Sequence, residues 1–195
     1  PQDMTCGTPW KLILMFAVPL ILGNIFQELY TIVDTMVVGK KLGVNALAAV
    51  GATGWVFMFN SMLIQGFTQG FGIQIAKMVG ENDTVKLKRA ISNSIILSAL
   101  LSIVLLLGMQ LIINPAMHIL RIPLNIRDIS VTYLRVIFVG IPFSVAYNIF
   151  AVILRSLGNS KTPLNAMVIS TSSNIVLDIL FVVGLQWGVI GAAVA

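Results

Sequence analysis

Two aspartates, Asp34 and Asp178, lie within stretches of the sequence that are otherwise apolar enough to cross a membrane. A charged carboxylate near the centre of a bilayer costs roughly 2.5–3.5 kcal/mol even on the most lenient insertion scale. Such a residue therefore faces the interior of a protein, where a proton or a cation neutralises it, and by default it marks a functional site. The chemistry expected of this pair is the binding of H⁺ or Na⁺.

Polar residues share a helical face with each aspartate. Gln27 and Tyr30 stand seven and four positions before the first aspartate, and Ser170 and Asn174 stand eight and four before the second. Oxygen atoms along one face suit a proton or a hard cation, and we expect Tyr133 to enter the fourth apolar segment at a comparable depth. For Asn174 alone, an interhelical hydrogen bond is the simpler explanation.

The composition is that of a membrane protein. Of 195 residues, 57% are hydrophobic and 10% charged, whereas soluble domains carry about 25% charged residues. Because a helical span needs about 20 mainly apolar residues, we predict an all-α, polytopic helical membrane protein with five complete spans and the start of a sixth. The spans are Trp10–Gly39, Ala46–Ala76, Ala90–Ile113, Val131–Leu154 and Pro163–Gly184, with the sixth from about Gly188. Since Pro1 is no initiator and the sequence stops inside an apolar run, we expect the N-terminal part of a longer chain.

The basic residues indicate the orientation of the spans rather than a nucleic-acid surface. Seven lie at the N-terminus and in the segments 77–89 and 155–161, and five lie on the opposite side. Cytoplasmic loops are enriched in Lys and Arg, so we predict a cytoplasmic N-terminus. The seven are Lys11, Lys77, Lys86, Lys88, Arg89, Arg155 and Lys161, and the five are Lys40, Lys41, Arg121, Arg127 and Arg135.

This orientation places the two aspartates at one depth. Asp34 lies five residues before the outer end of the first span, and Asp178 lies six before the outer end of the fifth. Both spans run from inside to outside, so each carboxylate lies roughly 8–9 Å below its helix end. The sequence does not show whether they face each other. Glu28 lies about 120° around the helix from Asp34 and need not share that site.

Proline and glycine interrupt two of the spans. Pro19 lies well inside the first span and predicts a kink, which is either a static bend or a moving hinge. Gly140 and Pro142 predict a second kink, in the fourth span. We expect residues 114–130 to form a loop with a short interfacial helix.

The second span carries two residue pairs with helical spacing. Gly66 and Gly70 are four positions apart, as are Gln65 and Gln69, so each pair shares a face. Close helix packing with interhelical hydrogen bonds is the favoured explanation. A polar cavity lining is the alternative.

The cysteine and histidine content of the sequence argues against a disulfide and against the usual metal sites. The single Cys6 precludes an internal disulfide and a cysteine-cluster metal site. His118 falls within the expected 114–130 loop, where a solvated histidine is far more common than a ligand.

These residues carry a family likeness. In order, and over almost the whole chain, the sequence resembles the N-terminal part of a multidrug and toxic compound extrusion (MATE) transporter of the DinF-like prokaryotic branch. Each motif alone is weak, and their order makes the match specific. The motifs are Pro9–Lys11, Pro19, Tyr30–Gly39, Leu47–Gly51, Tyr133–Arg135, Gly140–Phe143, Leu154–Pro163 and Asn174–Asp178.

The resemblance implies a twelve-helix exporter of two six-helix lobes, with residues 1–195 forming the N-terminal lobe. It implies antiport, in which H⁺ or Na⁺ enters and an amphipathic, often cationic compound leaves, with no enzymatic reaction and no organic cofactor. The protein would be a monomer in the cell membrane that binds small molecules and lipid but no nucleic acid.

The resemblance also implies roles for individual residues. An aspartate of the first helix, with an asparagine and an aspartate of the fifth, holds the coupling cation, which is H⁺ or Na⁺. A tyrosine of the fourth helix lies near that site, and bending at a proline of the first helix accompanies cation binding. The expected residues are cation-coupling Asp34, Asn174, Asp178 and Tyr133, hinge Pro19, and cavity-lining Gln27, Tyr30, Gln65 and Gln69.

Three other classes of protein fit less well. A lipid-linked oligosaccharide flippase of the same superfamily would need a strongly cationic central cavity, whereas the intramembrane charges here are mainly acidic. An intramembrane aspartyl protease would need a Gly-x-Gly-Asp motif, but Asp178 follows Ile175-Val176-Leu177. A purely structural bundle would not need two acids at one depth.

Overall fold

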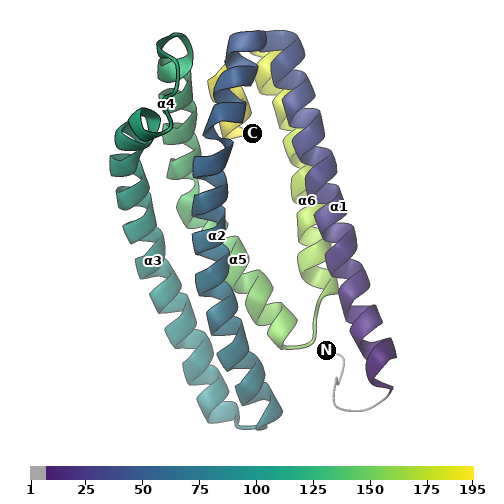
Figure 1. Cartoon of the computed structure of the whole chain (residues 1–195). Coiled ribbons are helices and arrows are strands. Elements are labelled where there is room, and N and C mark those ends of the chain that lie inside the picture. Colours follow the sequence, from purple (N-terminus) through teal and green to yellow (C-terminus); the bar gives the residue numbers. More distant parts are fainter. Residues whose placement is uncertain (1–7) are drawn as a thin grey trace.

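The computed structural model describes residues 8–195, without the side chains of residues 9, 12, 16, 19, 20 and 30. The described chain is helical with no strand, as predicted, and α1 and α6 lie side by side on one side of α2 (Figure 1). The elements are α1 (Pro9–Leu42), α2 (Val44–Gly80), α3 (Thr84–Ile119), α4 (Leu124–Val139), α5 (Ile141–Ser156), α6 (Lys161–Asp178), the π-helix η1 (Ile179–Gly184) and α7 (Val189–Val194).

Several of these helices are long and apolar enough to cross a bilayer. Among the described residues they are α2, α3 and the continuous segment Lys161–Gly184, and the bent pair of α4 and α5 makes a fourth if it counts as one span. Some side chains of α1 lie outside the described part, so this count does not cover that helix in full. The predicted polytopic, all-helical membrane fold is confirmed.

The predicted kink in the fourth span is confirmed as a break between α4 and α5. The two helices meet at Gly140 and are bent by 46°. Pro142 has no N–H to donate to the preceding turn, and tighter bonds replace the regular ladder here. The Gly140 N–H donates to the Ile137 carbonyl at 2.9 Å, and the Phe143 N–H donates to the Gly140 carbonyl at 3.1 Å.

The prediction of a loop and a separate interfacial helix over 114–130 is wrong. Helix α3 continues through Pro115 to Ile119, and only residues 120–123 connect it to α4. Ile113 and Met117, on either side of this proline, are almost completely buried. Their packing keeps the last turns helical, because tertiary contacts override the local cost of a proline. His118 is exposed in the last turn of α3.

The main apolar core lies among α2, α3, α4 and α5. Its buried residues are Val56, Ile64, Leu105, Met109, Ile113, Met117, Leu134, Phe138, Ile141 and Val145. At the far end of this core, Gly72 of α2 lies directly against Val152 of α5, where a Cβ atom would overlap the valine side chain. The Ser156 hydroxyl donates to the Gly72 carbonyl at 3.0 Å, so glycine at this position allows α2 and α5 to approach closely.

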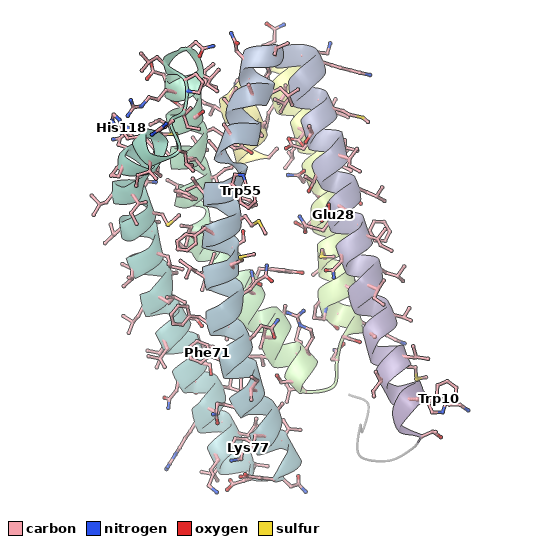
Figure 2. The ribbon with its side chains drawn as sticks, in the orientation of Figure 1. Trp10, Glu28, Trp55, Phe71, Lys77 and His118 are labelled. Atoms are coloured by element: carbon pink, nitrogen blue, oxygen red, sulfur yellow. The ribbon has the colours of Figure 1, made fainter. Side chains whose placement is uncertain are left out.

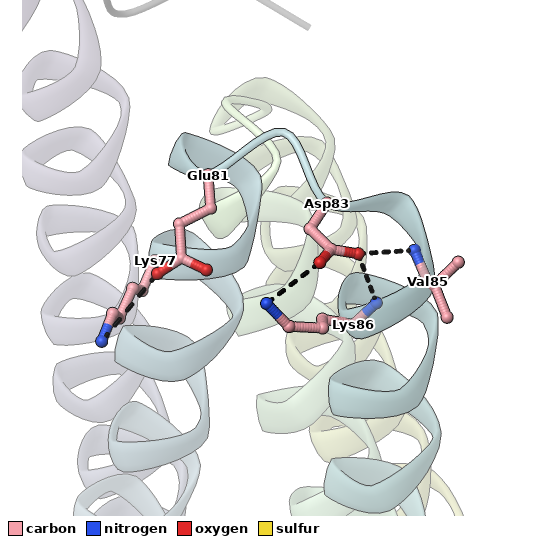
Figure 3. A network of polar contacts seen from close by, with 5 residues as sticks. All are labelled: Lys77, Glu81, Asp83, Val85 and Lys86. Atoms are coloured by element: carbon pink, nitrogen blue, oxygen red, sulfur yellow. Dashed lines mark hydrogen bonds and ion pairs between the residues drawn. The ribbon is translucent and has the colours of Figure 1, made fainter.

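A polar turn joins α2 to α3 (Figure 3). The Asp83 carboxylate accepts hydrogen bonds from the backbone N–H of Lys86 at 3.0 Å and of Val85 at 3.1 Å, and so caps α3. The Lys86 ammonium lies 3.1 Å from the same carboxylate. These bonds, above all those from Lys86, lower the pKa of Asp83. Lys77 and Glu81 form a looser ion pair at 3.9 Å.

Candidate cation-coupling site

Helices α1 and α6 pack along each other and run in the same direction (Figure 1). Gly23 of α1 lies directly against α6. A Cβ atom at this position would lie 2.6 Å from the terminal methyl carbon of Met167 and 3.6 Å from a methyl carbon of Leu164. The flexible end of Met167 could move aside for an alanine here, whereas a much larger residue would push α1 and α6 apart.

The two aspartates lie on these same packing faces, three turns beyond the Gly23–Met167 contact. Asp34 follows Gly23 by eleven residues, and Asp178 follows Met167 by eleven residues. Eleven residues are about three helical turns, so each carboxylate returns to the face that carries the contact. Asp34 is 8% exposed and Asp178 is fully buried, and they are close enough for their charges to interact. The structure therefore brings together two acids whose mutual placement the sequence left open.

Four buried oxygen atoms at this level have no hydrogen-bond partner among the described residues. They are Asp34 Oδ1, both carboxylate oxygens of Asp178, and Asn174 Oδ1. A buried charge without a partner is strongly unfavourable, so the site favours a bound proton or a bound cation. Carboxylate and amide oxygens are the ligands that hard cations prefer, and the three residues fit Na⁺ as well as H⁺.

A π-helix begins directly after Asp178. In η1 the hydrogen bonds span five residues, as in the 2.8 Å bond from the Leu185 N–H to the Leu180 carbonyl. Short π-helical segments occur frequently at functional sites, because they change the direction of side chains without ending the helix. The sequence of this segment is apolar and gives no indication of a π-helix.

An apolar cluster closes the site at the end nearest to α7. It consists of Val38 of α1, Ala46 of α2, Val182 of η1 and Ala192 of α7. The two valines stand one turn beyond Asp34 and Asp178 respectively. In the opposite direction, between the acids and the Gly23–Met167 contact, Gln27 and Ser170 are exposed. The acid pair thus lies between an apolar seal and a polar, open stretch.

The remaining predicted site residues are spread over other parts of the molecule. Tyr133 is half-buried on α4, and in the described structure α4 packs mainly against α2, α3 and α7 rather than along α1 or α6. The side chains of Pro19 and Tyr30 lie outside the described residues, so the hinge and the lining role of Tyr30 stay predictions.

The glutamines and glycines of α2 lie on its exposed side. Gln65 and Gln69 are exposed, and a Cβ atom on Gly66 or Gly70 would meet nothing within 4 Å. Within the described chain no helix packs against this G-x-x-x-G face, so its explanation as a helix-packing face stays a prediction. Glycines that do allow close packing include Gly23 and Gly72, which the spacing did not single out. Their only sequence signal is a glycine inside an apolar helix.

Long apolar helices around a buried, oxygen-rich acid pair are typical of a polytopic membrane protein with a functional site inside the membrane. The chain belongs to the MatE family, whose family model matches residues 19–180. The predicted resemblance is thereby confirmed.

The chain is also similar to individual members of that family. It is 30% identical, over its whole length, to the probable multidrug resistance protein YoeA of Bacillus subtilis (strain 168), and it covers 43% of that protein. It is 27% identical over 94% of its length to the multidrug export protein MepA of Staphylococcus saprophyticus, of which it covers 41%. The chain thus spans about two fifths of the length of these relatives.

Solved structures give the same result. The chain superimposes with a TM-score of 0.90 and 32% identity on a MOP superfamily transporter from Pyrococcus furiosus, described as having a binding pocket of reverse polarity. It superimposes equally well on the outward-facing conformation of a multidrug resistance MATE family transporter. Each match covers 96% of this chain and 41% of the other one.

Proposed function

We propose that the protein works as an antiporter, which takes up H⁺ or Na⁺ at the Asp34–Asp178 pair and exports amphipathic compounds. The observation that carries the proposal is the pair itself, buried between two parallel helices with carboxylate oxygens that no described group satisfies. The multidrug resistance and multidrug export names of the relatives support the kind of cargo.

The coupling would follow from charge neutralisation. Without a cation, two buried carboxylates repel each other and keep α1 and α6 apart. A proton or Na⁺ removes that repulsion and favours a closer packing of the two helices, with Asn174 supplying a further oxygen. A ligand shifts such an equilibrium only by its differential affinity for the two states, so alternating access requires that the two conformations bind the cation unequally. Bending at Pro19 is the proposed route by which α1 repacks.

The surroundings of the pair suggest how access alternates. The Val38–Val182 seal separates the acids from the end that the basic residues place outside. Exchange with the outer solution would then require Val38 to move away from Val182. In this proposal the protein acts as a monomer in the cell membrane, with a cytoplasmic N-terminus.

The oligosaccharide flippase is not favoured as an alternative. The relatives compared above are named for multidrug resistance or export, and the charged residues buried in the described helices are the two aspartates. A cationic cavity, which that function would need, has no counterpart among these buried groups.

The test is transport by the full-length protein in proteoliposomes under an imposed H⁺ or Na⁺ gradient. Wild-type protein should expel a fluorescent amphipathic dye only when one of the gradients is present. Asp34→Asn and Asp178→Asn should each abolish gradient-driven efflux while leaving membrane insertion intact. Asp128→Asn, which changes an exposed acid at the start of α4, is the matched control and should transport normally. Normal efflux by either of the first two variants would contradict the coupling role of the pair.

A further inference from the structure

The acid pair and the apolar seal form two neighbouring layers on the same pair of helix faces. Val38 follows Asp34 by four residues, and Val182 follows Asp178 by four residues. Four residues of α1 rise about 6 Å, so the seal lies one turn beyond the acids. On α1 both layers lie between Glu28, which Figure 2 labels, and the end of the helix.

Opening the seal by a rigid movement of the two helices would disrupt the ion site. If α1 and α6 separated as rigid rods, the carboxylates one turn away would separate by almost the same distance as the valines. The cation would then lose its ligands before it had a route to the outer solution. A change confined to the segment after Asp178 would open the seal and leave Asp34 and Asp178 together.

The segment after Asp178 is the π-helix η1, which has the structure that such a change needs. A turn closed by bonds between residues five apart holds one residue more than an α-helical turn, whose bonds span four. If η1 became α-helical, the residues at its end would turn by about one residue, or about 100°, relative to Asp178. Val182 lies inside the segment and would turn away from Val38 by part of that angle.

The composition of η1 lowers the free-energy cost of this rotation. Its sequence is Ile-Leu-Phe-Val-Val-Gly, so one apolar side chain would replace another in the seal and no polar side chain would be buried. Ile179 and Leu180 are about half exposed, so they have room to turn. Each backbone N–H would exchange a carbonyl five residues back for one four residues back, so the number of hydrogen bonds is conserved.

Contacts at the far end of η1 hold it in the π-helical form. The Trp187 N–H donates to the Phe181 carbonyl at 3.0 Å, and the two rings stack with their centroids 5.0 Å apart. A Cβ atom on Gly191 of α7 would lie 3.1 Å from the same carbonyl oxygen, so α7 also packs closely on Phe181. These contacts favour the π form and the conserved hydrogen bonds permit the α form, and two packings of similar free energy make a bistable element.

We propose that η1 is a switch that changes between a π-helical and an α-helical form during transport, and so opens the Val38–Val182 seal without separating the acid pair. The inference rests on the proposed function and names the conformational step that connects the ion site with the outer solution. Binding and release of the cation at Asp178 would bias the switch, because this residue is the last of α6 and directly precedes η1.

The test is deletion of Leu180 in the full-length protein. The deletion removes the extra residue, so residues 178–184 should form a regular helix while the segments before and after keep their faces. It should preserve membrane insertion and the melting temperature, and it should abolish gradient-driven efflux in proteoliposomes. Leu180→Ala keeps the length of η1 and should transport normally. Deletion of Leu107, a comparably exposed residue inside α3, should lower the melting temperature because it rotates all later residues of a regular helix.

A second measurement follows the seal directly. In a Cys6→Ser background, Val182→Cys in proteoliposomes is labelled with a membrane-impermeant maleimide, with sodium chloride or acidic buffer compared with choline chloride at neutral pH. Rates are taken relative to Val44→Cys at the start of α2, which is exposed. The relative rate should change by about tenfold or more with the cation, as expected for a shift between two populations. It should not change with the cation when Leu180 is deleted as well.

The inference is overturned if the protein without Leu180 transports normally, or if it loses as much thermal stability as the protein without Leu107. It is also overturned if labelling of Val182→Cys does not respond to the cation. Failure of the proposed function would look different, because gradient-driven efflux by wild-type protein would be absent while labelling of Val182→Cys still responded to the cation.

Discussion

Gly23 of α1 packs against the end of the Met167 side chain, and Asp34 and Asp178 lie eleven residues further along the same two parallel helices. The glycine–methionine contact and the acid pair three turns away therefore lie on the same face of each helix. This relationship explains how a sequence without any motif between the two aspartates brings them to one level.

The first prediction concerns that contact. Gly23→Ala should be tolerated, because the group that it would meet is the flexible end of Met167. Gly23→Leu should force the helices apart and reduce gradient-driven efflux by about tenfold or more, since overpacking costs about 1–3 kcal/mol and separates the carboxylates. Gly108→Leu is the control, because a Cβ atom there meets nothing within 4 Å. Equal efflux by the two leucine variants would show that the spacing of α1 and α6 does not matter.

The second prediction concerns the contact of α2 with α5. Gly72→Ala should destabilise the protein by about 1–3 kcal/mol, because its methyl group overlaps the stiff, β-branched Val152. Thermal denaturation in detergent measures the loss. The double variant Gly72→Ala/Val152→Ala should be more stable than additivity of the single changes predicts, because the two residues are in contact. Strict additivity would mean that the overlap is relieved elsewhere.

The third prediction concerns the apolar seal beyond the acid pair. In a Cys6→Ser background, a disulfide between Val38→Cys and Val182→Cys should hold α1 against η1 and stop efflux. Reduction should restore transport, and neither single cysteine variant should respond to oxidant. Full efflux by the cross-linked protein would show that Val38 and Val182 need not separate during transport.

The fourth prediction concerns the cap of α3 at Asp83. The pKa of Asp83 is lowered in the folded protein, mainly by hydrogen bonds from Lys86, so its stabilising effect is present above the pKa of the unfolded chain. The effect is lost as the pH falls through the folded pKa. Asp83→Ala should therefore lower the melting temperature at pH 7 and have a smaller effect near pH 2. Asp83→Asn keeps a capping oxygen and should be milder at pH 7; an alanine effect that is the same at both pH values would exclude an ionised cap.

The sequence by itself determined the features that depend on one segment of the chain at a time. The length of the apolar segments predicts an all-helical membrane fold because a span must satisfy its backbone internally. The missing N–H of Pro142 predicts the break between α4 and α5. The cost of a carboxylate in a bilayer singles out Asp34 and Asp178 before any partner is known.

Only the tertiary structure decided which faces meet. Whether Asp34 faces Asp178 depends on the rotation of α1 against α6, and the structure turns Gly23 of α1 towards Met167 of α6. The continuation of α3 through Pro115 depends on the burial of Ile113 and Met117, and the exposure of Gly66 and Gly70 depends on which side of α2 its neighbours occupy. The spacing of residues along a helix determines which of them lie on one face. The packing of the other helices determines what that face contacts.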